Sequence, residues 1–122
     1  MSLDEFGAEV DRALAGVPES FKPYLENVVI ETQWKPSRRL LQESQLGRDR
    51  LLLGIYIGHP LTRRNVDATP EMPDRIILFQ RNLEQACRSH AELRAEIRKT
   101  VYHEIGHHFG LSENDLDELG YG

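Results

Sequence analysis

The chain has one cysteine and no long apolar run, and both facts narrow its class. Cys87 is the only cysteine in 122 residues, so no disulfide can form within the chain. No apolar run approaches the roughly 18 residues that a membrane-spanning helix needs. The first ten residues are acidic and amphipathic, unlike a secretory signal. We therefore expect a cytoplasmic protein without a membrane partner.

The chain also has fewer basic than acidic residues. Lys and Arg number 15 against 20 Asp and Glu, and the net charge of −5 argues against a nucleic acid partner. The charge is uneven, because residues 35–64 are basic whereas residues 1–34 and 112–122 are acidic. The basic segment could guide an acidic substrate, or it could simply be a solvated surface that balances its neighbours.

The length of the chain suits one domain. With 122 residues, 39% of them hydrophobic, it can bury roughly two thirds of the surface that its unfolded chain exposes. The sequence has no internal repeat, low-complexity tract or linker. We expect a single domain over residues 1–122.

The stretch with the most specific chemistry is His103-Glu104-Ile105-Gly106-His107. Two histidines four positions apart lie one turn apart on the same side of a helix, so both imidazoles can reach one metal ion. Glu104 can then hold and deprotonate a water at the metal, since zinc lowers the pKa of such a water to about 7. The pattern indicates zinc-dependent hydrolysis with Glu104 as the general base. The plainer alternative is an amphipathic helix with solvated histidines.

The helix that carries this motif has start and end signals of its own. Ser89 and Glu92 form a capping box, which predicts a helix from His90, and Gly110 can adopt the left-handed conformation that ends one. We expect the histidines to face a cleft, with Glu96, Lys99 and Thr100 on the same side. Side chains four apart form an apolar ladder on the opposite side, which we expect to face the core: Leu93, Ile97, Val101, Ile105 and Phe109.

The other segments predict an α+β fold. Ser2 opens an N-terminal helix, and Pro18 ends it. Short helices are expected after Asn82 and after Ser112, each of which can act as an N-cap. Apolar or β-branched composition predicts three strands, at residues 27–33, 51–58 and 75–80. The stretches 35–50 and 59–74 remain without an assigned element and are candidate substrate loops.

Residues 103–121, HEIGHHFGLSENDLDELGY, resemble the short bacterial zincin-like metallopeptidases, which carry an H-E-x-x-H-H-F-G segment. The resemblance implies a minimal zincin fold, in which an N-terminal helix and a small sheet pack behind the metal-binding helix. The segment is more distantly similar to the metzincin peptidases. In their pattern His103 and His107 would bind the metal, Glu104 would be the general base, and Gly110 would be the turn.

The third-ligand position of the metzincin pattern falls on Glu113. Metzincins have His or Asp there, and glutamate is one methylene longer with the same carboxylate. The resemblance implies one zinc ion held by His103, His107 and Glu113, with Asp115 and Asp117 close enough in sequence to compete. We expect no methionine turn, because the two methionines are Met1 and Met72. The cleft is then a shallow groove or is completed by a protein partner.

We expect a zinc-dependent peptidase whose substrate is a peptide or an unfolded protein, bound as an added strand along residues 75–80. The alternative is a non-catalytic zinc-binding or protein-interaction module; an intact Glu104 favours the enzyme. His108 points about 100° away from His107, so packing or contact with a metal-binding residue is favoured over a role as a ligand. Tyr102 and Tyr121 are the tyrosines nearest the motif in sequence, and neither is singled out as an oxyanion donor.

Overall fold

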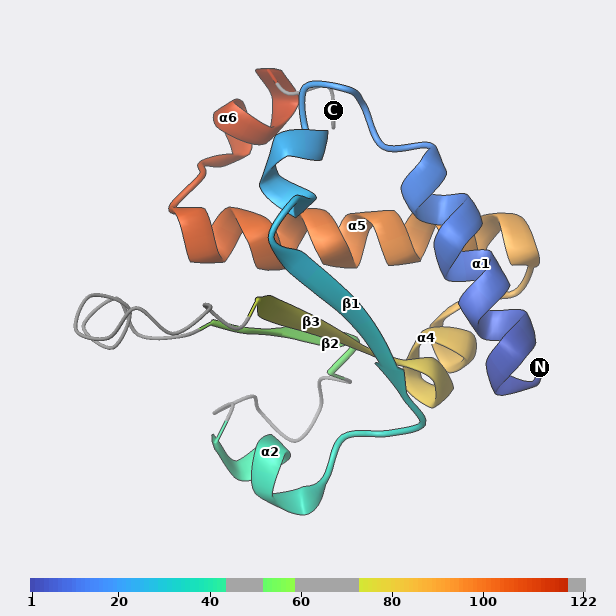
Figure 1. Ribbon diagram of the computed structural model, residues 1–122. Helices are drawn as coiled ribbons and strands as arrows, with labels where there is room; N and C mark the ends of the chain where they lie inside the picture. The colour runs from blue at the N-terminus through green and yellow to red at the C-terminus, as the bar shows by residue number, and fades with distance from the viewer. Residues whose placement is uncertain (44–51, 59–72, 119–122) are drawn as a thin grey trace.

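The computed structural model describes residues 1–43, 52–58 and 73–118, and Figure 1 shows how their elements are arranged. A small sheet has α1 and α5 on one face and α2 on the other, which is the α+β class that the sequence predicts. None of the described helices is both long and apolar enough to cross a membrane. The elements in chain order are α1 (Leu3–Ala15), η1 (Lys22–Leu25), β1 (Val28–Gln33), α2 (Arg38–Glu43), β2 (Gly54–Ile57), β3 (Asp74–Phe79), α4 (Gln80–Ala86), α5 (His90–Phe109) and α6 (Glu113–Glu118).

The strand order is β1-β3-β2, with β1 parallel and β2 antiparallel to β3. The prediction that residues 75–80 offer an edge to substrate was therefore wrong, because they form most of the central strand. Ile76, Leu78 and Phe79 are fully buried, as expected for a strand that pairs on both sides. Within the described sheet, the edge strand that contacts α5 is β2.

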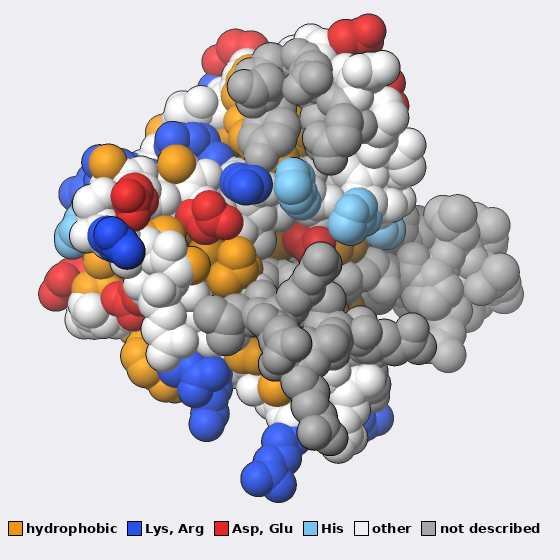
Figure 2. All heavy atoms as spheres, turned by 180° about the vertical axis from the view of Figure 1, so that it is seen from behind, with side chains coloured by type: hydrophobic (Ala, Val, Ile, Leu, Met, Phe, Trp, Pro, Cys, Tyr) orange, Lys and Arg blue, Asp and Glu red, His pale blue; other side chains and the backbone are white. Residues whose placement is uncertain are grey.

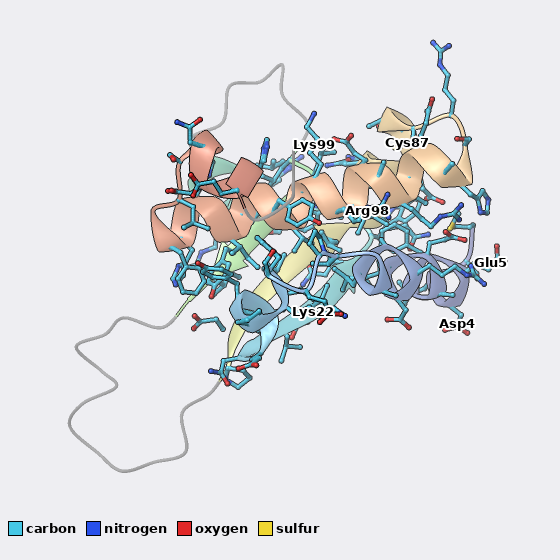
Figure 3. The ribbon with its side chains drawn as sticks, turned by 90° about the horizontal axis from the view of Figure 1, so that it is seen from above. Asp4, Glu5, Lys22, Cys87, Arg98 and Lys99 are labelled. Atoms are coloured by element: carbon cyan, nitrogen blue, oxygen red, sulfur yellow. The ribbon has the colours of Figure 1, made fainter. Side chains whose placement is uncertain are left out.

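The core lies between the sheet, α1 and α5. The predicted ladder is buried at Leu93, Ile97, Val101 and Ile105, where it meets apolar side chains of α1. Phe109 departs from the prediction and is 48% exposed in the last turn of α5, where its ring meets the rings of Tyr24 and His108 edge-on. Seen from above, α1 runs beside the first half of α5 and leaves the half that carries the motif uncovered (Figure 3).

A buried carboxylate ties α1 to α5. Glu9 accepts from Arg94 at 2.7 Å and from Arg12 at 2.7 Å, and it lies 3.3 Å from Nδ1 of His90. The Arg94 guanidinium, chiefly, holds the pKa of Glu9 below its usual value. The two basic partners from α5 thus fix the start of that helix against α1.

The start signal of α1 and both end signals of α5 are confirmed, whereas α1 ends at Ala15, three residues before the Pro18 that was expected to end it. Ser2 accepts from the amide of Glu5 at 3.0 Å, and Ser89 accepts from the amide of Glu92 at 3.1 Å. Gly110 has φ 68° and ψ 29°, and the amide of the next residue donates back to Gly106 at 2.7 Å. This closes α5 in the way that a left-handed C-terminal glycine allows.

The predicted cap at Asn82 was wrong. The helix α4 begins at Gln80, directly after β3, and Asn82 lies inside it. The Asn82 side chain is 2% exposed and donates to the carbonyl of Leu52 at 2.8 Å. The side-chain amide of Asn82 therefore bonds to a residue that is distant in sequence, whereas local sequence rules assign it to a helix cap.

Gly54 lets α5 lie directly against β2. A Cβ at this position would lie 2.8 Å from Cγ2 of Thr100 and 3.1 Å from the carbonyl oxygen of Ile77. Thr100 is 9% exposed as a result, so the prediction that it lines an open cleft was wrong. The close approach brings the next turn of α5, which carries Glu104, to the strand.

Replacing Gly54 with alanine is expected to lower the free energy of unfolding by about 1–3 kcal/mol, the usual cost of overfilling a packed contact. Gly7 provides the matched control, because it lies inside α1 and a Cβ there meets nothing within 4 Å. Gly7→Ala is expected to stabilise the fold by about 0.5–1 kcal/mol through helix propensity. Urea denaturation measures both, and equal effects would show that the α5–β2 contact can accommodate a methyl group.

Candidate functional site

The motif occupies the last two turns of α5, on the part of the helix that α1 leaves uncovered. The side chain of His107 is 84% exposed, that of Glu104 is 21% exposed, and His103 is half-buried. Figure 2 shows histidine side chains gathered beside an acidic side chain on this face. The histidines are thus accessible, whereas the glutamate points toward the protein.

Glu104 is held by the edge of the sheet. The backbone amide of Tyr56 donates to Oε1 of Glu104 at 3.1 Å, and Oε2 lies 4.0 Å from Nδ1 of His107. The geometry follows from the pairing of β2: the amide of Phe79 donates to Leu53 at 3.0 Å, and alternate residues of an antiparallel strand point their backbone groups the other way. Gly54 and Tyr56 therefore direct their backbone groups away from β3.

The surroundings of Glu104 favour its neutral form. Burial raises the pKa of the Glu104 carboxyl above its usual value, and the Tyr56 amide and then His107 offset part of the rise. A carboxylate with a raised pKa is a better proton acceptor near neutral pH. A cation beside it would act in the opposite direction by stabilising the charged form.

A second cluster borders the motif at the end of α5. The hydroxyl of Tyr56 donates to Oδ2 of Asp74 at 2.7 Å, and Nε2 of His108 lies 3.6 Å from the same oxygen. The rings of Tyr56 and His108 stack at 3.9 Å with an interplanar angle of 15°. No sequence pattern pointed to Tyr56 or Asp74, which are far from the motif along the chain, and His108 was expected only to pack or to contact a metal-binding residue.

The third predicted ligand, Glu113, begins α6, but its side chain and that of Asp117 lie outside the described residues. Asp115 is engaged in a helix cap, where its Oδ2 accepts from the amide of Ser112 at 2.8 Å. The Ser112 hydroxyl accepts in return from the amide of Asp115 at 3.1 Å, which confirms Ser112 as the predicted cap. In this arrangement Asp115 is a weaker candidate ligand than the sequence alone suggests.

The donor set can be compared with what zinc requires. Among the described side chains no three His, Cys, Asp or Glu are grouped closely enough to hold a metal ion. His103 and His107 supply two imidazoles one helical turn apart, and zinc binds such a pair with one further nitrogen, oxygen or sulfur ligand. His103 and His107 therefore fit zinc in kind as two of its ligands, and the side chain of Glu113, the predicted third ligand, lies outside the described residues.

The nearest tyrosine of the same helix is not at the site. Tyr102 is 4% exposed, and its ring meets that of Phe21 edge-on at 4.6 Å in the core. Tyr121 lies outside the described residues. Neither residue is placed by the described structure to act as an oxyanion donor.

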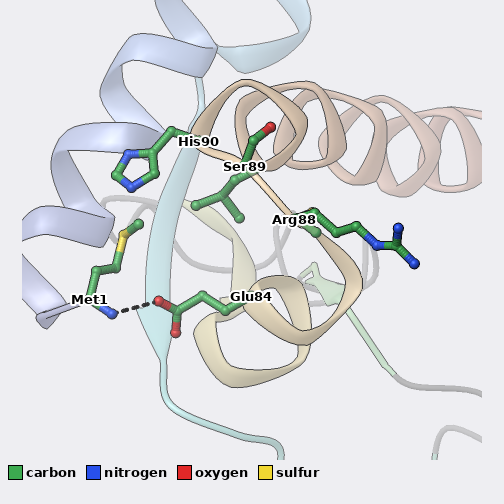
Figure 4. Close-up of a pocket in the computed structure, with 7 residues that line it drawn as sticks. Met1, Glu84, Arg88, Ser89 and His90 are labelled. Atoms are coloured by element: carbon green, nitrogen blue, oxygen red, sulfur yellow. Dashed lines mark hydrogen bonds and ion pairs between the residues drawn. The ribbon is translucent and has the colours of Figure 1, made fainter.

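A separate pocket of about 260 Å³ lies at the opposite end of α5 (Figure 4). It is lined by Met1, Glu84 and the first residues of α5, and the ammonium of Met1 pairs with Glu84 at 2.9 Å. Thirteen residues of helix, or about 20 Å, separate His90 from the motif. This pocket therefore plays no part in the candidate metal site.

The profile of a family described as zincin-like metallopeptidase matches residues 25–122. The chain belongs to the zincin-like metallopeptidase family, and the family implies a metal, usually zinc. A solved structure of a conserved hypothetical protein from T. thermophilus is similar, with a TM-score of 0.54 and 24% sequence identity over 89% of this chain and 94% of that chain. That likeness concerns the fold alone. A search of curated proteins found no significant match.

Proposed function

We propose that this protein is a zinc-dependent peptidase that hydrolyses peptide bonds with Glu104 as the general base. The observation that carries the proposal is the position of Glu104, whose carboxylate is held at 3.1 Å by the edge of β2 and faces His107 at 4.0 Å. Membership of the zincin-like metallopeptidase family supports the class of reaction.

His103, His107 and Glu113 would hold one zinc ion. Two neutral imidazoles and one carboxylate leave a net positive charge on the site, and three protein ligands leave a coordination position open. Zinc would supply Lewis acidity, which polarises the substrate carbonyl and acidifies water. The proton transfers of the reaction would be carried out by a side chain of the protein and not by the zinc ion.

Glu104 would carry the proton during hydrolysis. It would take a proton from the attacking water and pass it to the leaving amine, so that a carboxylate is regenerated at the end of the cycle. The bond from the Tyr56 amide fixes Oε1, which leaves Oε2 as the oxygen available to the water. Burial raises the pKa of Glu104, which suits a group that must both accept and release a proton.

The edge of β2 opposite β3 could take an extended substrate. Gly54 directs its backbone groups away from β3, and a peptide could add there as a further strand beside Tyr56, whose own amide already donates to Glu104. Two residues along β2 advance about 6.6 Å, which is close to the roughly 6 Å that four residues advance along α5. Every second residue of β2 therefore stays beside successive turns of α5 as the two elements pass Glu104. Recognition through backbone groups would favour peptides or unfolded protein of varied sequence, and a protein partner could complete the cleft.

The rival function is a zinc-binding module without catalysis. A structural zinc site needs ligands but no additional carboxylate oriented by a backbone amide. The contact between Glu104 and Tyr56 therefore favours the peptidase, although a partner-binding role would use the same metal ligands.

The direct test is cleavage of a mixed peptide library by the full chain, with zinc present and after its removal by a chelator. We expect cleavage products that depend on zinc and reappear when zinc is restored, with mass spectrometry identifying the cleaved bonds. If a chain shown to contain zinc cleaves neither the library nor an unfolded protein, the interaction module becomes the better description.

A further inference from the structure

Tyr56, Asp74 and His108 form a cluster at the end of α5 that the proposed chemistry does not use. We infer that this cluster is a bracket that sets the rotation of the last turns of α5 about the helix axis against β2, with Asp74 as the positioning residue for Glu104 and His107. The inference rests on the proposed zinc site. It assigns no contact with substrate to any of the three residues.

Tyr56 is the centre of the bracket because it makes three different contacts. Its amide donates to Glu104 at 3.1 Å, its hydroxyl donates to Asp74 at 2.7 Å, and its ring stacks on His108 at 3.9 Å. Glu104 and His108 are four residues apart, so they lie on one side of α5 and one turn apart. A single residue of β2 thus contacts the helix on two successive turns.

The core orients α5 as far as Ile105, the last buried residue of the apolar ladder, and the two contacts of Tyr56 extend this restraint over the following turn to His108. His103 and His107 lie about 100° around the axis from Glu104 and His108, since each follows or precedes its neighbour by one residue. Fixing the side that faces β2 therefore fixes the direction in which the two metal-binding histidines point. Their own side chains need no partner in the sheet for this to hold.

Asp74 holds the bracket from the central strand. The residue is 8% exposed, and one oxygen of its carboxylate accepts from Tyr56 and lies 3.6 Å from Nε2 of His108. Loss of this carboxylate would remove the oxygen that the phenol of Tyr56 and the imidazole of His108 share. Because the Tyr56 hydroxyl donates to Asp74, it is a positioning group and not a free oxyanion donor.

Gly58 makes the close stacking possible. A Cβ at this position would lie 2.8 Å from Cε1 of His108 and 3.3 Å from Cε1 of Tyr56. The chain thus leaves β2 directly beside both rings, and a larger residue would push them apart. The bracket is thus bounded by β3, by the two stacked rings and by the backbone that follows β2.

The test is the zinc dissociation constant of the full chain, measured by competition with a chromophoric chelator. Asp74→Ala is expected to weaken zinc binding by about 10- to 100-fold, the usual effect of losing a group that orients metal ligands. Tyr56→Phe keeps the amide and the ring and is expected to weaken binding less. The double variant should be no weaker than Asp74→Ala if the hydroxyl positions the helix through Asp74, to which it donates at 2.7 Å.

Two further variants separate positioning from loss of stability. Asn82→Ala removes a buried hydrogen bond at the other end of β3, so it should destabilise the fold but leave zinc affinity within about twofold. Asp74→Asn keeps an oxygen that can accept from Tyr56 and should recover most of the affinity lost in Asp74→Ala.

Three outcomes of these zinc titrations decide whether the bracket positions the zinc ligands. Zinc binding by Asp74→Ala and Tyr56→Phe as tight as in Asn82→Ala would overturn the bracket and leave the zinc site standing. A parent chain that binds no zinc would overturn the proposed function and, with it, the bracket. If Asp74→Ala does not fold, Tyr56→Phe alone decides, since it removes a single oxygen atom.

Discussion

Replacing Glu104 with glutamine is expected to slow peptide hydrolysis by at least about a hundredfold, the scale on which a positioned acid-base group contributes. Glutamine has the same shape, and its carbonyl oxygen can still accept from the amide of Tyr56. It cannot take a proton from water. Initial rates with a peptide selected from the library measure the loss, and metal analysis should show an unchanged zinc content.

Glu96→Gln is the matched control for this substitution. Glu96 lies on the same helix, eight residues before Glu104, and undergoes the same chemical change. The Glu96→Gln variant should keep activity within about twofold, because the substitution changes no group near the motif. Equal rates in both variants, with zinc retained, would point to a contaminating protease or to a mechanism without a glutamate base.

Local rules of sequence were sufficient for most of the elements. The two serine caps predicted the starts of α1 and α5, and the glycine at position 110 predicted the end of α5, because each forms hydrogen bonds within a few residues. The apolar ladder predicted which side of α5 is buried, and composition predicted all three strands. The errors at Asn82 and Thr100 have a common cause, since each side chain is set by a contact with a distant segment.

Strand order and the bracket were beyond local rules. Nothing in the composition of β2 or β3 states which of them is central, and the misplaced substrate edge followed from that. Asp74 and His108 are 34 residues apart and meet only because β3 and the end of α5 are brought together by the fold. The residues of the motif were visible in sequence because a helix places them together by itself; their roles as ligands and base stay predictions.

The second large effect concerns zinc itself. The parent chain is expected to bind about one zinc ion, and His103→Ala combined with His107→Ala should weaken binding by about a thousandfold or more, since each is a direct ligand and even indirect groups contribute about 10- to 100-fold. His90→Ala is the control, because this imidazole lies on the same helix but contacts Glu9. If the double variant binds zinc as tightly as the parent, the site lies elsewhere.

The same titration on single variants of α6 places the third ligand. Glu113→Ala should weaken zinc binding by at least about tenfold, because losing one of three ligands exposes the ion to a further water. Asp115→Ala should leave the affinity near that of the parent, since the Asp115 carboxylate already accepts from the amide of Ser112 at 2.8 Å. Its cost should appear in the stability of α6 instead, as expected for the loss of a helix cap. The opposite pattern, with Glu113→Ala unaffected and Asp115→Ala or Asp117→Ala weakened tenfold, would show that the chain turns more widely after Gly110 than the metzincin pattern implies.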